Sequence, residues 1–544
     1  MKGDSNILSG PPFISKGFHL SLGQYLHGRI QKYGSKTALV NADTGEEVSF
    51  EKIINDSRKL SVYLQKLGLT TNDRIAICSE NNFNFCTASF SSFLLGITLC
   101  PANPLYTETE FVHILSISKP KYIFVSPTVA SKLRKIASEL PWSPKLILLY
   151  TDVSQSEIPN VPDIINKVPD FESDNLQLPR VDIENHVAVI LYSSGTLGMP
   201  KGVMLTDMNL LHLAERLVEF TDTSILPDDM SLTISGIMPF FHGYGFSALF
   251  LVSLHLGLKM VTFDRFEERK FLAAIEKYKI NILTLVPTLI VFFVKSPLIE
   301  EYDLSSILKV ICGGAKLSLE MEKAMISRFN LDHINHSYGL TETSFAVISQ
   351  NAKRNKIGSI GILEPGISAK VISIEDGSSK EALGPYCEGE LCFKGANIMK
   401  GYCDAPDSTK SVIDKDGWLH SGDVGYYDED GYFYIVDRIK ELIKYKGYQV
   451  APAELEAILM THPSVTDTAV VGLPDENAGE LPLAFVVKKS DSKLTTDEVV
   501  NYVNERVSPT KKLRGGVRFV NKIPKNATGK ILRRELRSSL QSKL

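Results

Sequence analysis

The stretch YSSGTLGMPKG, residues 192–202, combines residue types that suit phosphate binding. It follows an apolar segment typical of a strand and carries three glycines, a threonine and a lysine. Glycine lets backbone N–H groups approach an anion closely, hydroxyl groups add donors, and lysine adds positive charge. The pattern differs from the GxxxxGK[ST] loop, because Pro200 precedes Lys201 and Gly202 follows it. A kinase or GTPase of that class is therefore disfavoured, and an ordinary glycine-rich turn is the alternative.

The elements around this stretch predict an α/β protein. Apolar segments at 74–80, 121–127, 145–152, 186–195 and 308–315 alternate with helical periodicity, which favours parallel sheets with helices on their faces. The most apolar run, 281–295, contains Pro287 and is shorter than the roughly 20 residues that span a bilayer. We therefore expect buried core there and no transmembrane segment.

Size and composition narrow the class of protein further. The 544 residues are 44% hydrophobic and 22% charged, which predicts a globular chain of two to four structural units. A net charge of −4 argues against nucleic acid as a partner. The seven cysteines form no CxxC pair, so a zinc or disulfide framework is not expected and a reducing compartment is.

The composition of the sequence changes near residue 437. The segment 437–450 is basic, and a helix is expected from Pro452, where proline suits the first helical position. Strands are expected at 466–472 and 483–489, and a helix at 495–507. We therefore predict a large N-terminal domain of several layers, mostly parallel sheets, over residues 1–437. A small mobile α+β domain is predicted over 438–544, with a hinge near 437–440.

Five motifs in order resemble the adenylate-forming superfamily of acyl-CoA synthetases, 4-coumarate:CoA ligases and beetle luciferases. They are SSGTLGMPKGV (193–203), SYGLTET (337–343), GWLHSGDVGYYDEDG (417–431), DRIKELIKYKGYQVAPAELE (437–456) and PKNATGKILRRELR (524–537). The segments 441–456 and 513–519 look like the insect branch of luciferases and luciferase-like fatty acyl-CoA synthetases. The resemblance implies that a carboxylate attacks ATP to give an acyl-adenylate and pyrophosphate, and that CoA then displaces AMP. It also implies Mg²⁺, which offsets phosphate charge.

The resemblance assigns roles to residues of the N-terminal part. The predicted pyrophosphate loop comprises Ser193, Ser194, Gly195, Thr196, Gly198 and Lys201. The Thr341 hydroxyl is expected on phosphate oxygens, and the Glu342 carboxylate on Mg²⁺, a cation that prefers oxygen. The adenine site is expected between Tyr338 with Gly339 and the wall formed by Gly313, Gly314 and Ala315. His242 is expected near the substrate carboxylate; for the neighbouring Phe240, Phe241, Tyr244 and Phe246, core packing and an acyl tunnel both stay open.

Further roles follow for residues near and beyond the predicted hinge. Asp423 is expected to bind both ribose hydroxyls, with Arg438 beside it. Lys530 is expected to contact the carboxylate and the α-phosphate during adenylation, where positive charge suits the transition state. Lys444 and Gly447 are expected to serve the thioester half after a hinge rotation. The DEDG turn at 428–431 is predicted to be a solvated turn rather than a metal site.

Several residues depart from the family pattern. Leu197 replaces a threonine, and one hydrogen bond to a charged group contributes roughly 1.5–3 kcal/mol, so we expect slower adenylation but not its loss. Luciferases carry arginine where Leu213 aligns and serine where Phe345 aligns. These changes favour an alkyl chain, and hence a medium- to long-chain fatty acid:CoA ligase. Asp207 and Lys316 also depart from the pattern, with no consequence that the sequence indicates.

Three other functions stay open: a luciferin 4-monooxygenase, an aryl-acid ligase of the coumarate type, and a weak adenylate-binding protein, the last because of Leu197. The C-terminal Ser542, Lys543 and Leu544 match an address read by the peroxisomal import receptor, so we expect a peroxisomal protein.

Overall fold

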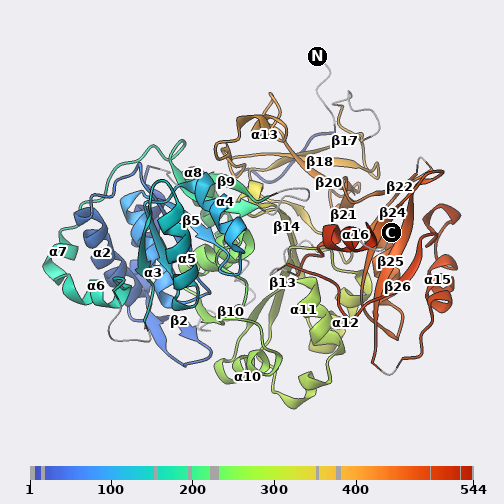
Figure 1. The fold of residues 1–544 in the computed structure, drawn as a ribbon, viewed down its shortest axis with the longest axis horizontal. Helices are drawn as coiled ribbons and strands as arrows, with labels where there is room; N and C mark the ends of the chain where they lie inside the picture. Colours follow the sequence, from blue (N-terminus) through green and yellow to red (C-terminus); the bar gives the residue numbers. More distant parts are fainter. Residues whose placement is uncertain are drawn as a thin grey trace.

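The computed structural model describes residues 6–13, 19–151, 157–193, 199–220, 232–350, 355–374, 381–446, 448–490, 492–526 and 529–541, without the side chains of 217–220 and 541. Four β-sheets with surrounding helices make up this part of the chain (Figure 1). The mixed α/β class, with a large N-terminal part and a smaller α+β C-terminal part, confirms the predicted fold class.

Two large sheets carry most of the N-terminal part, and their central strands are parallel. The seven-stranded sheet has the order β19 (Gly401–Tyr402), β9 (Lys201–Thr206), β8 (Val187–Ser193), β5 (Thr98–Ala102), β4 (Arg74–Cys78), β6 (Tyr122–Val125) and β7 (Lys145–Leu148). The nine-stranded sheet has the order β16 (Ile362–Leu363), β15 (Ala346–Ser349), β14 (Asn335–Gly339), β13 (Lys309–Gly313), β12 (Ile282–Leu285), β10 (Thr233–Gly236), β11 (Lys259–Thr262), β2 (Thr37–Asn41) and β3 (Glu47–Ser49). Buried side chains of both sheets belong to one continuous hydrophobic cluster.

A third sheet is antiparallel throughout and connects the large sheets to the C-terminal part. It has the order β1 (Leu8–Ser9), β17 (Ser368–Ile372), β18 (Gly389–Lys394), β20 (Leu419–Tyr427) and β21 (Phe433–Arg438). Of its neighbouring strands, β20 and β21 are joined by a short loop, a connection that antiparallel pairs allow.

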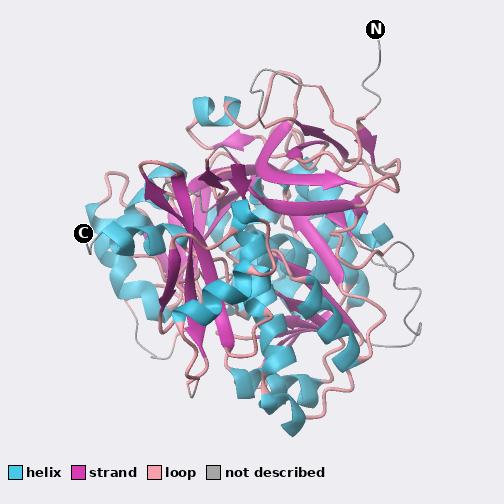
Figure 2. Cartoon of the chain, turned by 90° about the vertical axis from the view of Figure 1, so that its right-hand side faces the viewer, coloured by secondary structure: helices cyan, strands magenta, loops and turns pink. Residues whose placement is uncertain are grey.

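The C-terminal part has a sheet and a core of its own. Its strands are β22 (Ile443–Tyr445), β23 (Tyr448–Val450), β24 (Val465–Asp475), β25 (Gly479–Lys488) and β26 (Gly516–Phe519). Figure 2 places this unit toward the viewer, and its apolar side chains form two clusters on the two faces of the sheet. The sheet begins five residues after β21 ends at Arg438. The hinge predicted at 437–440 covers the last two residues of β21 and the first two of this connection, and it stays a prediction.

The helices flank the sheets. Those of the N-terminal part are α1 (Leu22–Ile30), α2 (Phe50–Lys66), α3 (Phe83–Leu95), α4 (Glu108–Ser118), α5 (Pro127–Glu139), α6 (Val161–Lys167), α7 (Asp170–Asp174), α8 (Asp207–Phe220), α9 (Val252–Leu256), α10 (Glu268–Tyr278), α11 (Pro287–Lys295), α12 (Leu319–Phe329) and α13 (Pro406–Lys410). Those of the C-terminal part are α14 (Pro452–Met460), α15 (Thr496–Asn504) and α16 (Arg533–Gln541). Pro452 occupies the start of α14, as predicted, because its missing N–H has no intrahelical partner there.

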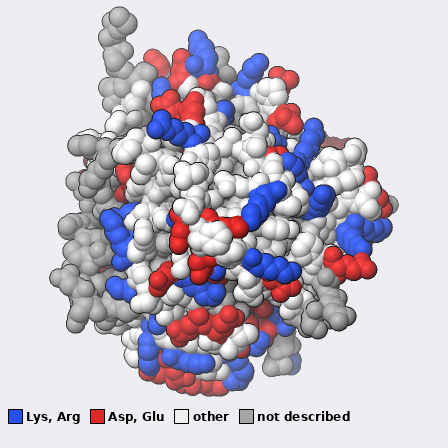
Figure 3. All heavy atoms as spheres, turned by 90° about the vertical axis from the view of Figure 1, so that its left-hand side faces the viewer, with Lys and Arg blue, Asp and Glu red and all other residues white. Residues whose placement is uncertain are grey.

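Three expectations about local structure can be compared with these elements. The apolar run 281–295 forms β12 and α11, and none of the helices in the described ranges is long and apolar enough to cross a bilayer. Acidic and basic side chains are interspersed on the face shown in Figure 3, as the near-neutral charge suggests. The DEDG turn is not simply solvated: Asp428 is buried, and its carboxylate pairs with the Lys356 ammonium at 2.7 Å and accepts the Tyr434 hydroxyl.

Candidate active site

A cavity of about 520 Å³ lies where the nine-stranded sheet, the antiparallel sheet and the C-terminal unit meet. Its lining includes seven residues that the sequence analysis assigned to nucleotide or substrate binding: Gly314, Ala315, Tyr338, Gly339, Asp423, Arg438 and Lys530. These residues come from the carboxyl ends of β13, β14 and β21, from the middle of β20 and from the segment before α16. Tertiary structure therefore brings together groups that are up to 216 positions apart in the sequence.

Glycine shapes one wall of the cavity, at the end of β13. A Cβ atom on Gly313 would lie 3.1 Å from the Ser337 carbonyl oxygen and 3.6 Å from Cε1 of Tyr244. Gly314 has a φ of 84°, a backbone conformation that side-chain-bearing residues rarely adopt. The main chain at Gly313 and Gly314 therefore forms a wall without bulky side chains. This is the wall that the sequence analysis expects to face Tyr338 across the adenine ring.

Asp423 is held by two partners from neighbouring elements. The Tyr338 hydroxyl donates a 2.7 Å hydrogen bond to Oδ2, and Nε of Arg438 lies 3.1 Å from Oδ1. Asp423 and Arg438 face each other directly across β20 and β21, so strand register fixes this pair. Burial raises the pKa of Asp423, while Arg438 and the Tyr338 hydrogen bond oppose that rise. A fixed carboxylate at the cavity edge suits a ligand with two vicinal hydroxyls.

Lys530 projects from a tight turn that enters the cavity. The Asn526 side chain accepts the Lys530 N–H at 2.9 Å, the Asn526 N–H donates to the Lys530 carbonyl, and Gly529 has a φ of 77°. A Cβ on Gly529 would lie 2.8 Å from Oγ1 of Thr288 on α11, so the turn packs directly on the N-terminal part. Burial and the nearby Arg438 lower the pKa of Lys530 to about 8. The Lys530 ammonium is therefore poorly solvated, so it would interact strongly with an anion bound in the cavity.

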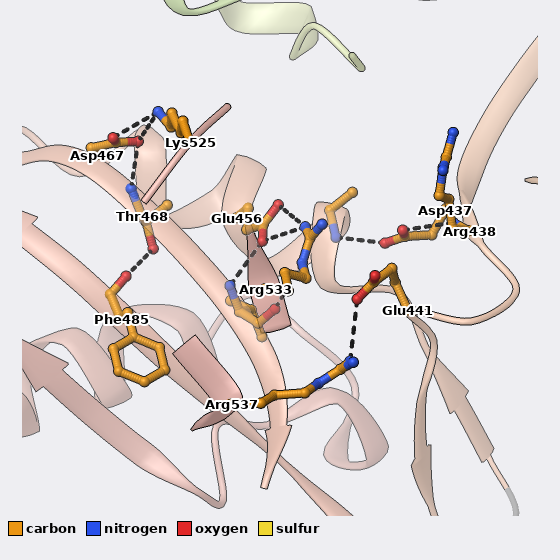
Figure 4. A network of polar contacts seen from close by, with 12 residues as sticks. Asp437, Arg438, Glu441, Glu456, Asp467, Thr468, Phe485, Lys525, Arg533 and Arg537 are labelled. Atoms are coloured by element: carbon orange, nitrogen blue, oxygen red, sulfur yellow. Dashed lines mark hydrogen bonds and ion pairs between the residues drawn. The ribbon is translucent and has the colours of Figure 1, made fainter. Parts of the chain in front are cut away.

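Ion pairs anchor the Lys530 segment on both sides (Figure 4). On one side, Lys525 pairs with Asp467 of β24 at 2.7 Å. On the other side, Arg533 pairs with Glu456 of α14 at 2.6 Å, and both groups are largely buried. Each anchor ties the segment to the C-terminal unit itself. Both ion pairs therefore hold the Lys530 segment against the C-terminal unit.

Further contacts fix the start of the C-terminal unit. Figure 4 also shows Arg537 of α16 pairing with Glu441 at 3.2 Å. The Asp437 carboxylate accepts the N–H groups of Arg438 at 2.7 Å and of Ala453 at 2.8 Å. These bonds attach the end of β21 to α14, next to the connection where the hinge is predicted.

His242 and Thr341 lie on the N-terminal side of the same region. A Cβ on Gly243 would be 3.5 Å from Oγ1 of Thr341, so the two segments are in contact. Burial, with a smaller contribution from the Lys530 charge, lowers the pKa of His242 to about 4. His242 is therefore neutral at pH 7. Its Nδ1 accepts the Tyr244 N–H at 3.3 Å, which leaves Nε2 to carry the proton.

Tyr402 connects two predicted ligands and was not identified from the sequence. Its hydroxyl donates a 2.8 Å hydrogen bond to Oε1 of Glu342, and the Lys201 ammonium lies 4.7 Å from its ring centroid. Tyr402 is buried on the short strand β19, which pairs with β9, the strand that Lys201 begins. Nothing in the local sequence around Tyr402 indicates this contact, because it arises from strand pairing of Tyr402 with Val203, 199 positions away.

The phosphate loop joins the antiparallel strands β8 and β9. Ser193 and Lys201, the last and first residues of these strands, are paired directly with each other. Nε2 of His113 on α4 lies 2.8 Å from the Pro200 carbonyl oxygen, which fixes the return of the chain. The expected phosphate ligands Ser194, Gly195, Thr196 and Gly198, together with Leu197, lie outside the described residues.

The predicted thioester-face residues lie apart from the cavity. Lys444 is exposed on β22, where its N–H donates to the Glu480 carboxylate, and it does not belong to the described lining of the cavity. Gly447 is outside the described residues. Of the two predicted catalytic lysines, Lys530 lines the cavity in this structure, and Lys444 is not part of its described lining.

The aromatic residues near His242 divide into two groups. Phe240 and Phe246 are fully buried and pack with Phe250 in an aromatic core cluster. Tyr244 instead stacks on Phe345, with ring centroids 5.6 Å apart and an interplanar angle of 23°. Core packing is thus the observed role of Phe240 and Phe246, while the Tyr244–Phe345 pair lies beside Gly313 of the site.

The remaining departures from the family pattern also have places in the structure. Leu213 is fully buried on α8. Asp207 accepts the Leu22 N–H at 2.7 Å and lies 2.5 Å from Nδ1 of His186, so it holds the starts of α1 and α8 together. Lys316 lines the cavity, and its ammonium lies 3.4 Å from the Val436 carbonyl oxygen of β21.

Comparison with known proteins agrees with this geometry. The AMP-binding enzyme family model matches residues 26–403, and the AMP-binding enzyme C-terminal domain matches residues 454–530. The chain is 40% identical over 549 positions to the luciferin 4-monooxygenase of Nipponoluciola cruciata, covering 99% of this chain and 98% of that protein. It is 36% identical over 530 positions to 4-coumarate–CoA ligase 1 of Petroselinum crispum, covering 96% and 95% of the two chains.

The structural comparison agrees with the family match. ATP-bound MatB from Rhodopseudomonas palustris superposes with a TM-score of 0.85 at 25% identity, covering 96% of this chain and all of that one. The apo form of the same MatB gives a TM-score of 0.73 at 24% identity. Sequence, fold and site geometry together show that the chain belongs to the AMP-binding, adenylate-forming enzyme family.

Proposed function

We propose that this protein is an ATP-dependent fatty acid:CoA ligase that acts through an acyl-adenylate, with medium- to long-chain acids as substrates. Membership of an ATP-using, adenylate-forming family supports the reaction type. The observation that carries the choice of acid is the stacked pair of Tyr244 and Phe345 beside Gly313.

In the first half-reaction, a carboxylate oxygen of the acid attacks the α-phosphorus of ATP, and the bond to pyrophosphate breaks. Lys530 supplies positive charge near the attacking group and the α-phosphate, where charge develops. His242, neutral and protonated on Nε2, can donate a hydrogen bond without competing with Lys530 for the anion. Asp423 and Tyr338 hold the nucleoside in the register that in-line attack needs.

Glu342 is the residue that we assign to Mg²⁺. Its carboxylate is held by Tyr402 through one oxygen and is a hard donor, the kind that Mg²⁺ prefers. Bound Mg²⁺ would neutralise phosphate charge.

In the second half-reaction, the CoA sulfur attacks the acyl carbon and AMP leaves, while the thiol proton passes to solvent. We propose that the C-terminal unit turns about 437–440 before this step, removes Lys530 and presents the face that carries Lys444. The separate core of that unit and the anchors of the Lys530 segment support motion as a rigid body.

The selection of an alkyl chain follows from shape and polarity. The Phe345 ring stacks on Tyr244 and occupies space that a serine would leave open. A rigid bicyclic acid needs a wide flat slot, whereas a flexible chain can bend past the ring. Leu213, fully buried on α8, is uncharged and so offers no ion pair to a polar aromatic acid.

The test is a panel of acids with the full chain, MgATP and CoA. Pyrophosphate release and thioester formation are measured for octanoate, palmitate, coumarate and luciferin, and light emission is recorded for luciferin. CoA-dependent turnover on the fatty acids with kcat/KM at least tenfold above that on coumarate is expected. Preference for coumarate, or strong light with luciferin, would overturn the proposal and favour the corresponding alternative function.

Matched variants separate pocket shape from general damage. Phe345→Ser is expected to raise kcat/KM for coumarate or luciferin relative to palmitate, whereas Phe171→Ser, which changes an exposed phenylalanine of α7, should leave the ratio unchanged. A Phe345→Ser enzyme with an unchanged acid preference would contradict the role of the stacked pair.

The peroxisomal location stays a prediction, because Ser542–Leu544 lie outside the described residues. Deletion of the three residues from a fluorescently tagged chain should redistribute it in cells.

A further inference from the structure

We propose that Glu390, Cys392 and His420 form a binding site for Zn²⁺, separate from the nucleotide site and its predicted Mg²⁺. The three side chains offer a carboxylate oxygen, a sulfur and an imidazole nitrogen that all lie within 4.8 Å of one another. The proposal does not depend on the acid that the enzyme uses.

The antiparallel sheet places these residues on one face. Glu390 and Cys392 are two positions apart on β18, so their side chains point the same way. Cys392 is paired directly with His420 on β20. The ladder shifts register between Glu390 and Cys392, and such irregularities redirect side chains. Backbone pairing thus fixes the cluster without any loop.

The distances suit a small tetrahedral ion. Nδ1 of His420 lies 2.9 Å from Oε2 of Glu390 and 3.7 Å from Sγ of Cys392. Ligands bound to Zn²⁺ at about 2.0–2.3 Å are roughly 3.3–3.8 Å apart in a tetrahedron. Small side-chain movements would therefore open the cluster around an ion. A mixed sulfur, nitrogen and oxygen set favours Zn²⁺ over Mg²⁺, which binds oxygen alone.

The surroundings orient the ligands as metal sites require. Nε2 of His420, the ring nitrogen away from the cluster, faces Oδ2 of Asp414 at 3.8 Å. Metal-binding histidines commonly direct their second nitrogen to a carboxylate, which fixes the tautomer. Oε1 of Glu390 accepts the Gly422 N–H at 3.0 Å, which holds the carboxylate with Oε2 toward His420.

The cluster is also accessible from one side. Cys392 is buried, whereas the His420 side chain is 26% exposed and that of Glu390 is 15% exposed. An ion can reach the sulfur past the imidazole, and a water molecule can complete the fourth position. Binding replaces the proton on Nδ1 of His420 or on the Cys392 thiol, so each ion bound must release protons.

The test measures binding of the metal alone to the full nucleotide-free chain. After EDTA treatment and its removal, Zn²⁺ is titrated by calorimetry in two buffers, and Co²⁺ is titrated by absorbance. One equivalent of Zn²⁺ with proton release is expected, as is a thiolate-to-Co²⁺ charge-transfer band that Zn²⁺ abolishes. Absence of this band, or its persistence in Cys392→Ser, would overturn the proposal.

Variants locate the site and guard against unfolding. Cys392→Ser is nearly isosteric, and Glu390→Gln is a second variant that keeps the thiol. Each should weaken Zn²⁺ binding by more than tenfold, and Asp414→Asn by about tenfold. Cys387→Ser, which changes an exposed cysteine nearby, and Glu342→Gln, which changes the predicted Mg²⁺ ligand, should bind Zn²⁺ unchanged. Equal binding by folded Cys392→Ser, Glu390→Gln and the parent chain would show that the three groups form only a hydrogen-bonded cluster.

Discussion

The Tyr402 hydroxyl donates a 2.8 Å hydrogen bond to the Glu342 carboxylate, while its ring lies beneath the Lys201 ammonium. One buried side chain thereby connects the predicted Mg²⁺ ligand with the lysine of the phosphate loop. Burial raises the pKa of Tyr402, and the Glu342 charge and the hydrogen bond to it raise the pKa further, since ionisation would place two negative charges together. Tyr402 therefore stays neutral and acts as a donor across the working pH range.

Removal of that hydroxyl should weaken adenylation. A hydrogen bond to a charged group contributes roughly 1.5–3 kcal/mol, so Tyr402→Phe is expected to lower kcat/KM for MgATP by about tenfold or more. Pyrophosphate release at several Mg²⁺ concentrations checks this. The aromatic ring remains, so the contact with Lys201 is kept. Tyr386→Phe, an exposed tyrosine, is the control; equal activity of both variants would exclude a role for the Tyr402 hydroxyl.

Asp423 should control recognition of the ribose. Asp423→Asn removes the charge that pairs with Arg438, so KM for ATP should rise by about tenfold to a hundredfold. Preference for ATP over 2′-deoxyATP should fall in parallel, because the carboxylate can accept both ribose hydroxyls. Asp428→Asn, which breaks a buried pair with Lys356, should lower Tm and leave the nucleotide preference intact. Unaltered discrimination in Asp423→Asn would refute the ribose assignment.

Lys530 is expected to lower the free energy of unfolding and to accelerate adenylation. Its pKa falls from 10.5 to about 8 on folding, so between these values the unfolded chain binds more protons. The destabilisation is then fully present below pH 8 and fades as the pH rises toward 10.5. Lys530→Met should raise Tm at pH 7, with a smaller gain at pH 10, and lower adenylation about 10²–10³-fold.

Calorimetric melting across this pH range and pyrophosphate release supply the measurements. Lys525→Met is the matched control, because that lysine pairs with Asp467 and its removal should not raise Tm. A lower Tm for Lys530→Met at pH 7 would contradict a desolvated lysine.

Lys444 should affect only the second half-reaction. It is exposed on β22, away from the described cavity, so Lys444→Ala should release pyrophosphate at the parental rate in a single turnover. Thioester formation from isolated acyl-adenylate and CoA should fall by at least tenfold. Lys446→Ala removes a neighbouring exposed lysine and should change neither half. A slower first half in Lys444→Ala would argue against the proposed rotation.

Leu197 should slow the first half-reaction. Leu197→Thr restores a hydroxyl donor to the phosphate loop, and a gain of about tenfold to a hundredfold in pyrophosphate release is expected. Met199→Leu, a change two positions along, is the control. If Leu197→Thr leaves a fully active parent unchanged, the loop donors are already sufficient.

The chemistry of the loop and the class of the fold follow from the sequence by itself. Glycine, hydroxyl-bearing residues and lysine after an apolar strand predict an anion site. Glycine lets backbone N–H groups approach the anion, hydroxyl groups donate hydrogen bonds, and lysine supplies positive charge. The alternation of strands and helices predicts parallel sheets, which β4, β6, β7 and β13 confirm. Each of these features is a pattern of residue types along the chain, so it can be read without knowledge of contacts between distant segments.

Tertiary structure alone decided which groups meet. Tyr402 reaches Glu342 through pairing of β19 with β9, and His420 reaches Cys392 through the register of β18 and β20. The burial of Asp428 likewise depends on Lys356, 72 positions earlier. The pKa of Lys530 depends on burial against the N-terminal part. Contacts of this kind arise from packing between distant segments, so local residue patterns do not predict them.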